Sequence, residues 1–335
     1  MTWKQLCCIL VFGACVVVAQ ARVVINEVLY NAPGDYDSLQ FVEVANQGRE
    51  PVELGGWFFS KGIRHVFPPG SVLKPGGFIV LASDAVLFQE VYGSLPTAVF
   101  KGLIRKEGEE LEISDASGRP MDRVVFSDRH PWPVAADGFS ASLERISPDT
   151  PGDLRDNWEA SSLSAQPGRP GGTPGATNGV FSTNLPPRLS LLTLLPSTSK
   201  PGAQLPIECE VSDRDGIDSV TLVHSRARSG SAGEEERTPM VQGAPGVFQA
   251  RLLIGKETGA IHRVYFEARD RLGAVRRLPG ASEPRPAFSI WASEDTPSLT
   301  VPIIHLIQTS KPEMERLQKS RVQGGGPGAF AGRRG

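Results

Sequence analysis

Short hydrophobic runs alternate with turn sequences between residues 48 and 81. Trp57–Phe59, Val66–Phe67 and Phe78–Leu81 are separated by Gly-Gly, Pro-Pro-Gly and Lys-Pro-Gly-Gly. Gly permits positive φ angles and Pro presets φ, so these sequences favour turns. Aromatic and β-branched runs of this length are typical of strands. Because such short strands bury their apolar faces only between two packed sheets, the pattern predicts a β-sandwich.

The rest of the first half continues this pattern. Strands are expected at residues 22–30, 39–46, 99–104, 110–113, 121–126 and 139–146, and Trp158 lies on the last apolar run. Residues 114–118 read as a hairpin turn. A brief helix is expected around residues 85–92. We therefore assign residues 22–165 to one sandwich.

The second half predicts another all-β module after a break in composition. Seven of the nine residues from Pro167 to Gly175 are Pro or Gly, so residues 166–187 are expected to form a flexible linker. Leu205, Ile207, Cys209 and Val211 then begin a period-two alternation that recurs in three later runs. The predicted fold is all-β, with two immunoglobulin-like β-sandwich domains, 22–165 and 188–280, joined by this Pro/Gly-rich linker.

The N-terminus has the pattern of a signal peptide. Lys4 precedes an apolar run from Leu6 to Ala19, and Ala19-Gln20-Ala21 matches a cleavage site, so residues 1–21 should be removed after Ala21. A membrane-spanning helix requires a longer apolar run, of about 20 residues. A lipoprotein signal ending at Cys15 would have an aliphatic residue three positions before the cysteine, and Phe12 occupies that position. The protein is therefore expected to be exported, whether periplasmic, on the cell surface or secreted, with no membrane span after cleavage.

Charge and cysteine content narrow the function classes. Residues 22–165 contain 13 basic and 21 acidic residues, a net charge of −8, which disfavours phosphate backbones, so no nucleic-acid partner is expected. Residues 166–335 carry a mild +5. After signal removal Cys209 alone remains, so no intrachain disulfide can form, and the alternation places this thiol in the core.

Few residue patterns point to chemistry. The histidines are too scattered in sequence to suggest a zinc pair, and nucleophile-elbow and phosphate-loop motifs are lacking. No cofactor is expected. Glu27 and Glu43 lie on otherwise apolar strand faces; they are either a general acid/base pair or structural acceptors of backbone N–H or Arg hydrogen bonds.

Two further groups are candidates for binding. Asp213, Asp215 and Asp218 cluster in a turn, which fits either Asx hydrogen bonding or a weak calcium site without the EF-hand spacing. The loops around Tyr36 and Trp132 are the exposed candidates for contacting a partner. An exposed Trp beside prolines would be a binding anchor; the alternative is a packing role.

Four sequence blocks carry a family resemblance. They are Val24-Ile-Asn-Glu-Val28, Phe41-Val-Glu-Val-Ala-Asn46, Leu54-Gly-Gly-Trp57 and Leu73-Lys-Pro-Gly-Gly77. In this order they resemble the lamin tail domain, an immunoglobulin-like sandwich that also occurs in many exported bacterial proteins. The segments 141–145 and 157–158 are similar to its closing strands. The resemblance covers about Arg22 to Ala165 and implies an accessory or interaction module, without catalytic residues to transfer. The second module resembles bacterial immunoglobulin or fibronectin type III domains.

The C-terminal segment 281–335 is expected to be incomplete or disordered, with a strand at 301–307 and a short helix at 312–321. The order of signal peptide, lamin-tail module, immunoglobulin-like module and then this strand and helix, with Ile304-His305-Leu306 before the helix, resembles the N-terminal part of bacterial CotH-type proteins, which continue into a kinase-like domain. We expect a non-enzymatic binding or scaffolding protein that presents loops to a protein or glycan outside the cytoplasm. The alternative is the N-terminal fragment of a CotH-like kinase whose catalytic domain is missing from this chain.

Overall fold

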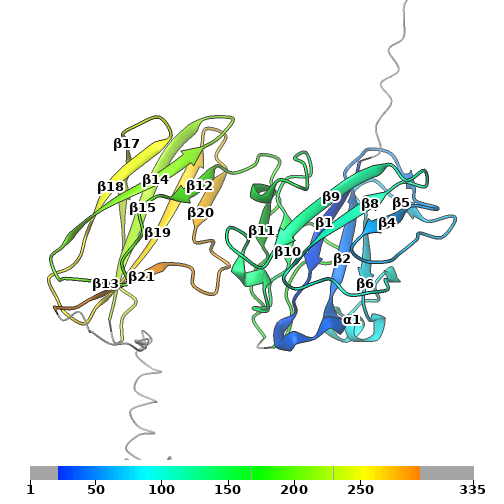
Figure 1. Ribbon diagram of the computed structural model, residues 1–335, viewed down its shortest axis with the longest axis horizontal. Coiled ribbons are helices and arrows are strands. Elements are labelled where there is room, and N and C mark those ends of the chain that lie inside the picture. Colours follow the sequence, from blue (N-terminus) through cyan, green and yellow to red (C-terminus); the bar gives the residue numbers. More distant parts are fainter. Residues whose placement is uncertain (1–21, 167, 229, 295–335) are drawn as a thin grey trace, which may run out of the picture.

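The computed structural model describes residues 22–166, 168–228 and 230–294 (Figure 1). The expected signal peptide and the expected C-terminal strand and helix lie outside these residues. The described part forms two β-sandwiches side by side, as the alternation of short apolar runs predicts. The predicted fold class is therefore confirmed.

The first sandwich packs a six-stranded sheet against a three-stranded sheet. The larger sheet has the order β11-β10-β1-β2-β6-β7, the smaller has the order β4-β8-β9, and β3 pairs with β5 in a separate two-stranded sheet. The strands are β1 (Val23–Leu29), β2 (Phe41–Asn46), β3 (Val52–Glu53), β4 (Phe58–Lys61), β5 (Val72–Leu73), β6 (Phe78–Ala82), β7 (Ala98–Val99), β8 (Gly108–Ser114), β9 (Pro120–Ser127), β10 (Leu143–Arg145) and β11 (Trp158–Ala160). Single 3₁₀ turns occupy Pro33–Asp35, Asp37–Leu39, Val134–Ala136 and Arg155–Asn157.

Local sequence signals set the helix and the hairpin turn of this sandwich. The helix α1 (Ala85–Tyr92) is confirmed; the Asp84 carboxylate accepts hydrogen bonds from the N–H groups of its first turn, and Gly93 ends it with φ +76°. The turn between β8 and β9 is also confirmed, with Gly118 at φ +84°. None of the helices in the described ranges is long and apolar enough to cross a membrane.

Two expected strands are shorter than their apolar runs suggest. The run at 99–104 contributes only β7, because Gly102 adopts φ +98° and turns the chain away from the sheet. The run at 139–146 contributes only β10, because Gly138 and Ser140 have φ angles of +78° and +87°. Hydrophobicity alone therefore overestimates the length of pairing.

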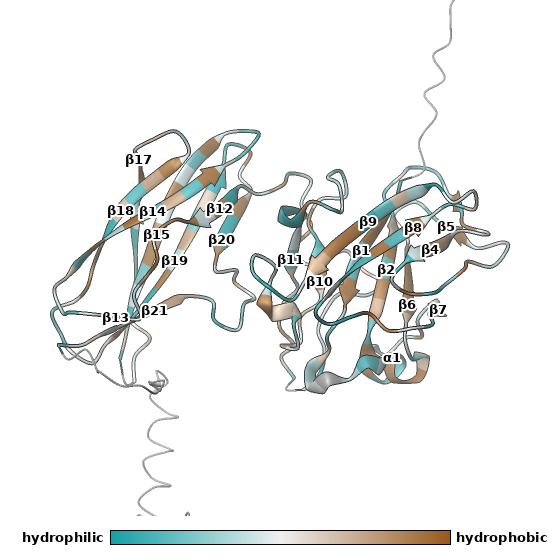
Figure 2. Ribbon diagram, viewed as in Figure 1, coloured by the Kyte–Doolittle hydropathy of each residue, from teal (hydrophilic) through white to brown (hydrophobic). Residues whose placement is uncertain are grey.

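The second sandwich packs the sheet β12-β14-β18-β17 against the sheet β13-β21-β19-β15-β16, with β20 also paired to β19. Hydrophobic and hydrophilic residues are interleaved along its strands (Figure 2). The strands are β12 (Arg188–Leu191), β13 (Thr198–Ser199), β14 (Gln204–Ser212), β15 (Ile217–Ala227), β16 (Glu235–Pro239), β17 (Val241–Gln242), β18 (Val247–Leu253), β19 (Ile261–Asp270), β20 (Val275–Leu278) and β21 (Phe288–Ala292). This sandwich extends past residue 280, since β21 pairs with β13 and β19.

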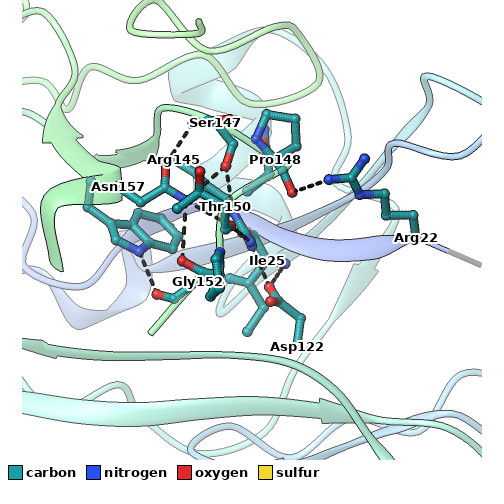
Figure 3. Close-up of polar contacts among 12 residues, drawn as sticks. Arg22, Ile25, Asp122, Arg145, Ser147, Pro148, Thr150, Gly152 and Asn157 are labelled. Carbon is teal, nitrogen blue, oxygen red and sulfur yellow. Dashed lines mark hydrogen bonds and ion pairs between the residues drawn. The ribbon is translucent and has the colours of Figure 1, made fainter. Parts of the chain in front are cut away.

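A buried ion pair joins the two sheets of the first sandwich (Figure 3). Arg145 of β10 donates to the Asp122 carboxylate of β9 at 2.6 Å, and to the carbonyl oxygens of Ile25 and Thr150 at 3.2 and 2.5 Å. Asp122 also accepts from the Ile25 N–H at 2.8 Å. Burial raises the pKa of Asp122, while the Arg145 charge and these hydrogen bonds oppose that shift. The guanidinium is compensated on several sides, as a buried charge requires.

Replacing Arg145 by Ala should lower the free energy of unfolding by about 3–5 kcal/mol, because Asp122 would be left as an uncompensated buried carboxylate. Urea denaturation at pH 7 measures this loss. Arg123→Ala is the matched control: Arg123 forms an exposed ion pair with Asp153, and its removal should leave the urea midpoint nearly unchanged. Equal effects of the two substitutions would contradict the role assigned to Arg145.

Candidate recognition groove between the two sandwiches

A groove of about 910 Å³ lies between the two sandwiches. The loop that contains His130–Phe139 and the segment Arg155–Glu159 line it from the first sandwich. The second sandwich contributes the chain from Arg188 to Leu195 and residues 276–288. In Figure 1, β12 and β20 lie on the side of the second sandwich that faces β11 of the first. The groove therefore depends on how the two domains are joined.

Arg276 of β20 connects the sandwiches. Its guanidinium donates to the Glu159 carboxylate at 2.7 Å, to the Asp156 carbonyl oxygen at 2.6 Å and to the Pro187 carbonyl oxygen at 3.3 Å. The Glu283 carboxylate adds a second connection by accepting from the N–H groups of Val134 and Ala135, each at 3.1 Å. These contacts come from both domains and hold the walls of the groove in place.

Exposed apolar side chains line the groove. Leu192 and Leu194 follow β12 and are 51% and 95% exposed. Phe139, from the first sandwich, is 52% exposed. Single exposed apolar residues are common, but three of them lining one groove are typical of an interaction site.

Several guanidinium groups accompany these apolar side chains. Arg188 is mostly exposed, and its Nε atom lies 3.7 Å from the Asp156 Oδ2 atom. Arg285 is also exposed. The Nε atoms of Arg155 and Arg277 are buried without a hydrogen-bond acceptor among the described residues. Burial lowers the pKa of Arg155. The groove thus combines apolar contact surface with incompletely compensated positive charge.

The two residues proposed from sequence as binding contacts, Tyr36 and Trp132, have different surroundings in the structure. Trp132 lines the groove, but only 9% of it is exposed, and it packs in the core of the first sandwich. Of the two roles considered for Trp132, the packing role is confirmed and that of an exposed aromatic anchor is wrong, because the core surrounds its ring. Tyr36 is 59% exposed, between two 3₁₀ turns, and does not line this groove. The leucines after β12 and the arginines were missed, although the Leu-rich run 189–195 is a visible signal.

Three glutamates form a row across the outer face of the larger sheet of the first sandwich. Glu27 of β1 pairs in register with Glu144 of β10 on one side and with Glu43 of β2 on the other. All three side chains are fully buried. Two of them, Glu27 and Glu43, were singled out by sequence. Glu144 joins them only through strand pairing.

The Pro/Gly-rich segment covers this row. We call residues 171–180 the strap. The Thr173 N–H donates to Glu27 at 2.9 Å, the Gly175 N–H to Glu43 at 2.5 Å and the Val180 N–H to Glu144 at 3.1 Å. The Thr173 hydroxyl donates to Glu144 at 3.0 Å. The glutamates therefore act as acceptors for a segment that has no regular secondary structure of its own.

Gly172 shows why this segment is rich in glycine. Its φ is +95°, and a Cβ atom there would lie 2.4 Å from a Glu27 carboxylate oxygen and 2.9 Å from the Ser142 hydroxyl. Glycine is required for close approach as well as for backbone conformation. Composition predicts that residues 166–187 form a flexible linker, whereas the structure shows that the strap within them is hydrogen-bonded to the first sandwich.

Burial sets the protonation of the glutamate row. Desolvation, then the neighbouring charges of Glu43 and Glu144, raise the pKa of Glu27 well above its ordinary value. Desolvation raises the pKa of Glu43 from 4.5 to about 7, opposed by the hydrogen bonds from Gly175 and Asn26, and it also raises that of Glu144. Three carboxylates this close are not all charged together. The row is shielded by the strap, which favours the structural interpretation over an acid/base pair.

The Asp-rich turn of the second sandwich forms local hydrogen bonds. The Asp213 carboxylate accepts from the Asp215 N–H at 2.7 Å, and Asp218 accepts from the Ser219 hydroxyl at 3.2 Å. These are the bonds of an Asx turn and its neighbour. In the described ranges, no group of three or more His, Cys, Asp or Glu residues is arranged to hold a metal ion.

Strand pairing creates a buried histidine pair that sequence reasoning missed. His224 of β15 and His262 of β19 are 38 residues apart, yet the Nε2 atom of His224 lies 2.7 Å from the Nδ1 atom of His262. Their ring planes differ by 9°. Burial, with a contribution from His224, lowers the pKa of His262 to about 4, and burial also lowers that of His224. One of the two facing nitrogens must be unprotonated, so the pair is stable in its uncharged form.

The glutamate row makes the first sandwich respond to pH. Because Glu43 has a raised pKa in the fold, its contribution to stability is complete below pH 4.5 and is lost as the pH rises to about 7. Each unit of pKa difference corresponds to about 1.4 kcal/mol. Glu43→Gln should flatten this dependence, and unfolding measured between pH 4.5 and 8 tests it. Glu53→Gln, on an exposed position of β3, should leave the slope unchanged; an unaltered slope in Glu43→Gln would contradict the assignment.

The histidine pair predicts the opposite dependence for the second sandwich. Since the pKa of His262 is lowered, the contribution of the pair to folding stability is complete above pH 6.5. This contribution is lost as the pH falls to about 4. His262→Gln should reduce the acid-induced drop in melting temperature between pH 7 and 4.5. His130→Gln, which alters an exposed histidine, serves as the control. The interpretation fails if both variants follow the wild-type profile.

The comparisons with known proteins concern the first sandwich. Residues 17–128 match the family model of the Lamin Tail Domain. The match ends just after β9, so β10, β11, the strap and the second sandwich lie beyond it. No curated protein matches the chain. The resemblance drawn from four sequence blocks is confirmed over this range: residues 17–128 are similar to lamin tail domains, immunoglobulin-like domains that often mediate binding.

Proposed function

We propose that the protein is an exported, non-catalytic binding or scaffolding protein, and that the groove between its sandwiches recognises a protein or glycan outside the cytoplasm. The observation that carries the proposal is the groove itself, in which exposed apolar side chains lie beside guanidinium groups. Concave sites with apolar walls and a few charged groups are the usual form of recognition sites. The binding role common among lamin tail domains supports it.

A binding role accounts for the titratable groups better than catalysis does. The groups with the most perturbed surroundings, the glutamate row and the histidine pair, are buried and engaged with one another or with the strap. A general acid or base must be within hydrogen-bond reach of its substrate. The kinase alternative rests on architecture and on residues 301–321, outside the described ranges, and supplies no candidate catalytic group.

Export is supported by the signal-like sequence and by the single cysteine that follows it. Cys209 is fully buried in the second core, and desolvation raises its pKa to about 12. A thiol in this environment is unreactive, so the fold tolerates an oxidising compartment without forming mixed disulfides. Signal cleavage after Ala21 is part of this proposal.

Site-specific photo-crosslinking in the native host tests the proposal. A photoreactive phenylalanine analogue at position 139 should crosslink one extracytoplasmic protein or glycan, identified by mass spectrometry, and the recovered protein should begin at Arg22. The same analogue at position 103, where Leu103 is 57% exposed away from the groove, is the control. Equal crosslinking at both positions, or an uncleaved cytosolic protein, would overturn the proposal.

A further inference from the structure

We infer that the groove binds an extended acidic peptide, with alternating carboxylate and apolar side chains, which pairs as an added strand beside β12. This inference deepens the proposed function and rests on it. It names the chemical class of the partner and the way in which the partner is held.

The first argument is the position of β12. Among the described strands, β12 is the terminal strand of its sheet and pairs only with β14. The Leu192 N–H donates to the Glu208 carbonyl oxygen, and bonding residues alternate along an antiparallel pair. The N–H and C=O groups of Leu189 and Leu191 therefore point away from β14. Both residues line the groove, so the part of this edge that β20 and Arg276 leave open is a template for an additional strand.

The second argument is the apolar surface next to this edge. Leu192 and Leu194 are exposed and follow β12 directly, and Phe139 lines the groove from the first sandwich. An added strand has side chains on alternating sides, so its apolar residues would all face one wall. Leucines favour aliphatic side chains over a hydrated glycan. The volume of about 910 Å³ lies within the range of natural ligand sites.

The third argument is charge. Five arginines line the groove, and its three acidic residues are already engaged: Glu159 with Arg276, Asp156 with Arg155 and Arg188, and Glu283 with two backbone N–H groups. Arg285 is exposed and has no ion-pair partner within the described residues. Carboxylates of a peptide would complete the compensation of these charges. A second copy of this groove would instead bring like charges together, which disfavours self-association.

Fluorescence anisotropy with a defined probe tests the inference. The probe is a labelled, N-acetylated and C-amidated heptapeptide of alternating Glu and Val, compared with its Lys-Val counterpart and with a version N-methylated at each Val. We expect saturable binding of the acidic peptide, and at least about tenfold weaker binding of the other two. The double variant Leu192→Ala/Leu194→Ala and the double variant Arg188→Ala/Arg285→Ala should each raise Kd by at least about tenfold.

Matched controls lie on β18 of the same sheet. Leu253→Ala and Arg251→Ala alter exposed residues outside the groove and should leave Kd unchanged. The inference is overturned if the acidic peptide does not bind, if the Lys-Val or N-methylated peptide binds equally well, or if groove and control variants behave alike. It is also overturned if the protein dimerises through Leu192 and Leu194. Crosslinking at position 139 without binding of the acidic peptide would refute this inference and leave the proposed function standing.

Discussion

Two consecutive ionisable residues on β10, Glu144 and Arg145, hold irregular segments of the first sandwich against its sheets. Side chains alternate across a strand, so Arg145 points between the sheets, whereas Glu144 points to the outer face. Arg145 binds Asp122 of the opposite sheet and the loop that leads to β11. Glu144 binds the strap. Because both polar side chains are buried, each requires hydrogen-bond partners, and these partners fix the position of otherwise irregular segments.

The strap is held against the first sandwich and leads directly into the second. Its hydrogen bonds to the glutamate row end at Val180, and the chain then reaches Pro187 and β12 within a few residues. Arg276 binds the Pro187 carbonyl oxygen as well as the first sandwich. The linker and the interdomain contacts therefore both hold the walls of the groove in place. Such preorganisation lowers the entropic cost of binding.

Local signals predicted the elements that local physics controls. The helix at Ala85–Tyr92 has its cap in Asp84 and its stop in Gly93, and both are visible in the sequence. The hairpin turn at 114–118 contains Gly118, which adopts the positive φ angle that the turn requires. Burial of Glu27 and Glu43 followed from strand alternation. The third member of the row, Glu144, did not, because register between strands more than a hundred residues apart is set by the whole sheet.

The amino-acid sequence by itself determined the all-β class, the two sandwiches, the lamin-tail similarity of the first and the core position of Cys209. The fold class, the two sandwiches and the position of Cys209 depend on periodicity and turn chemistry, which act over a few residues, whereas the lamin-tail similarity rests on four sequence blocks. Only the tertiary structure decided that the Pro/Gly-rich segment binds a row of glutamates, that two distant histidines touch, and that Trp132 is buried while Leu192 and Leu194 line a groove. Those outcomes depend on strand register and domain packing, which no local pattern encodes.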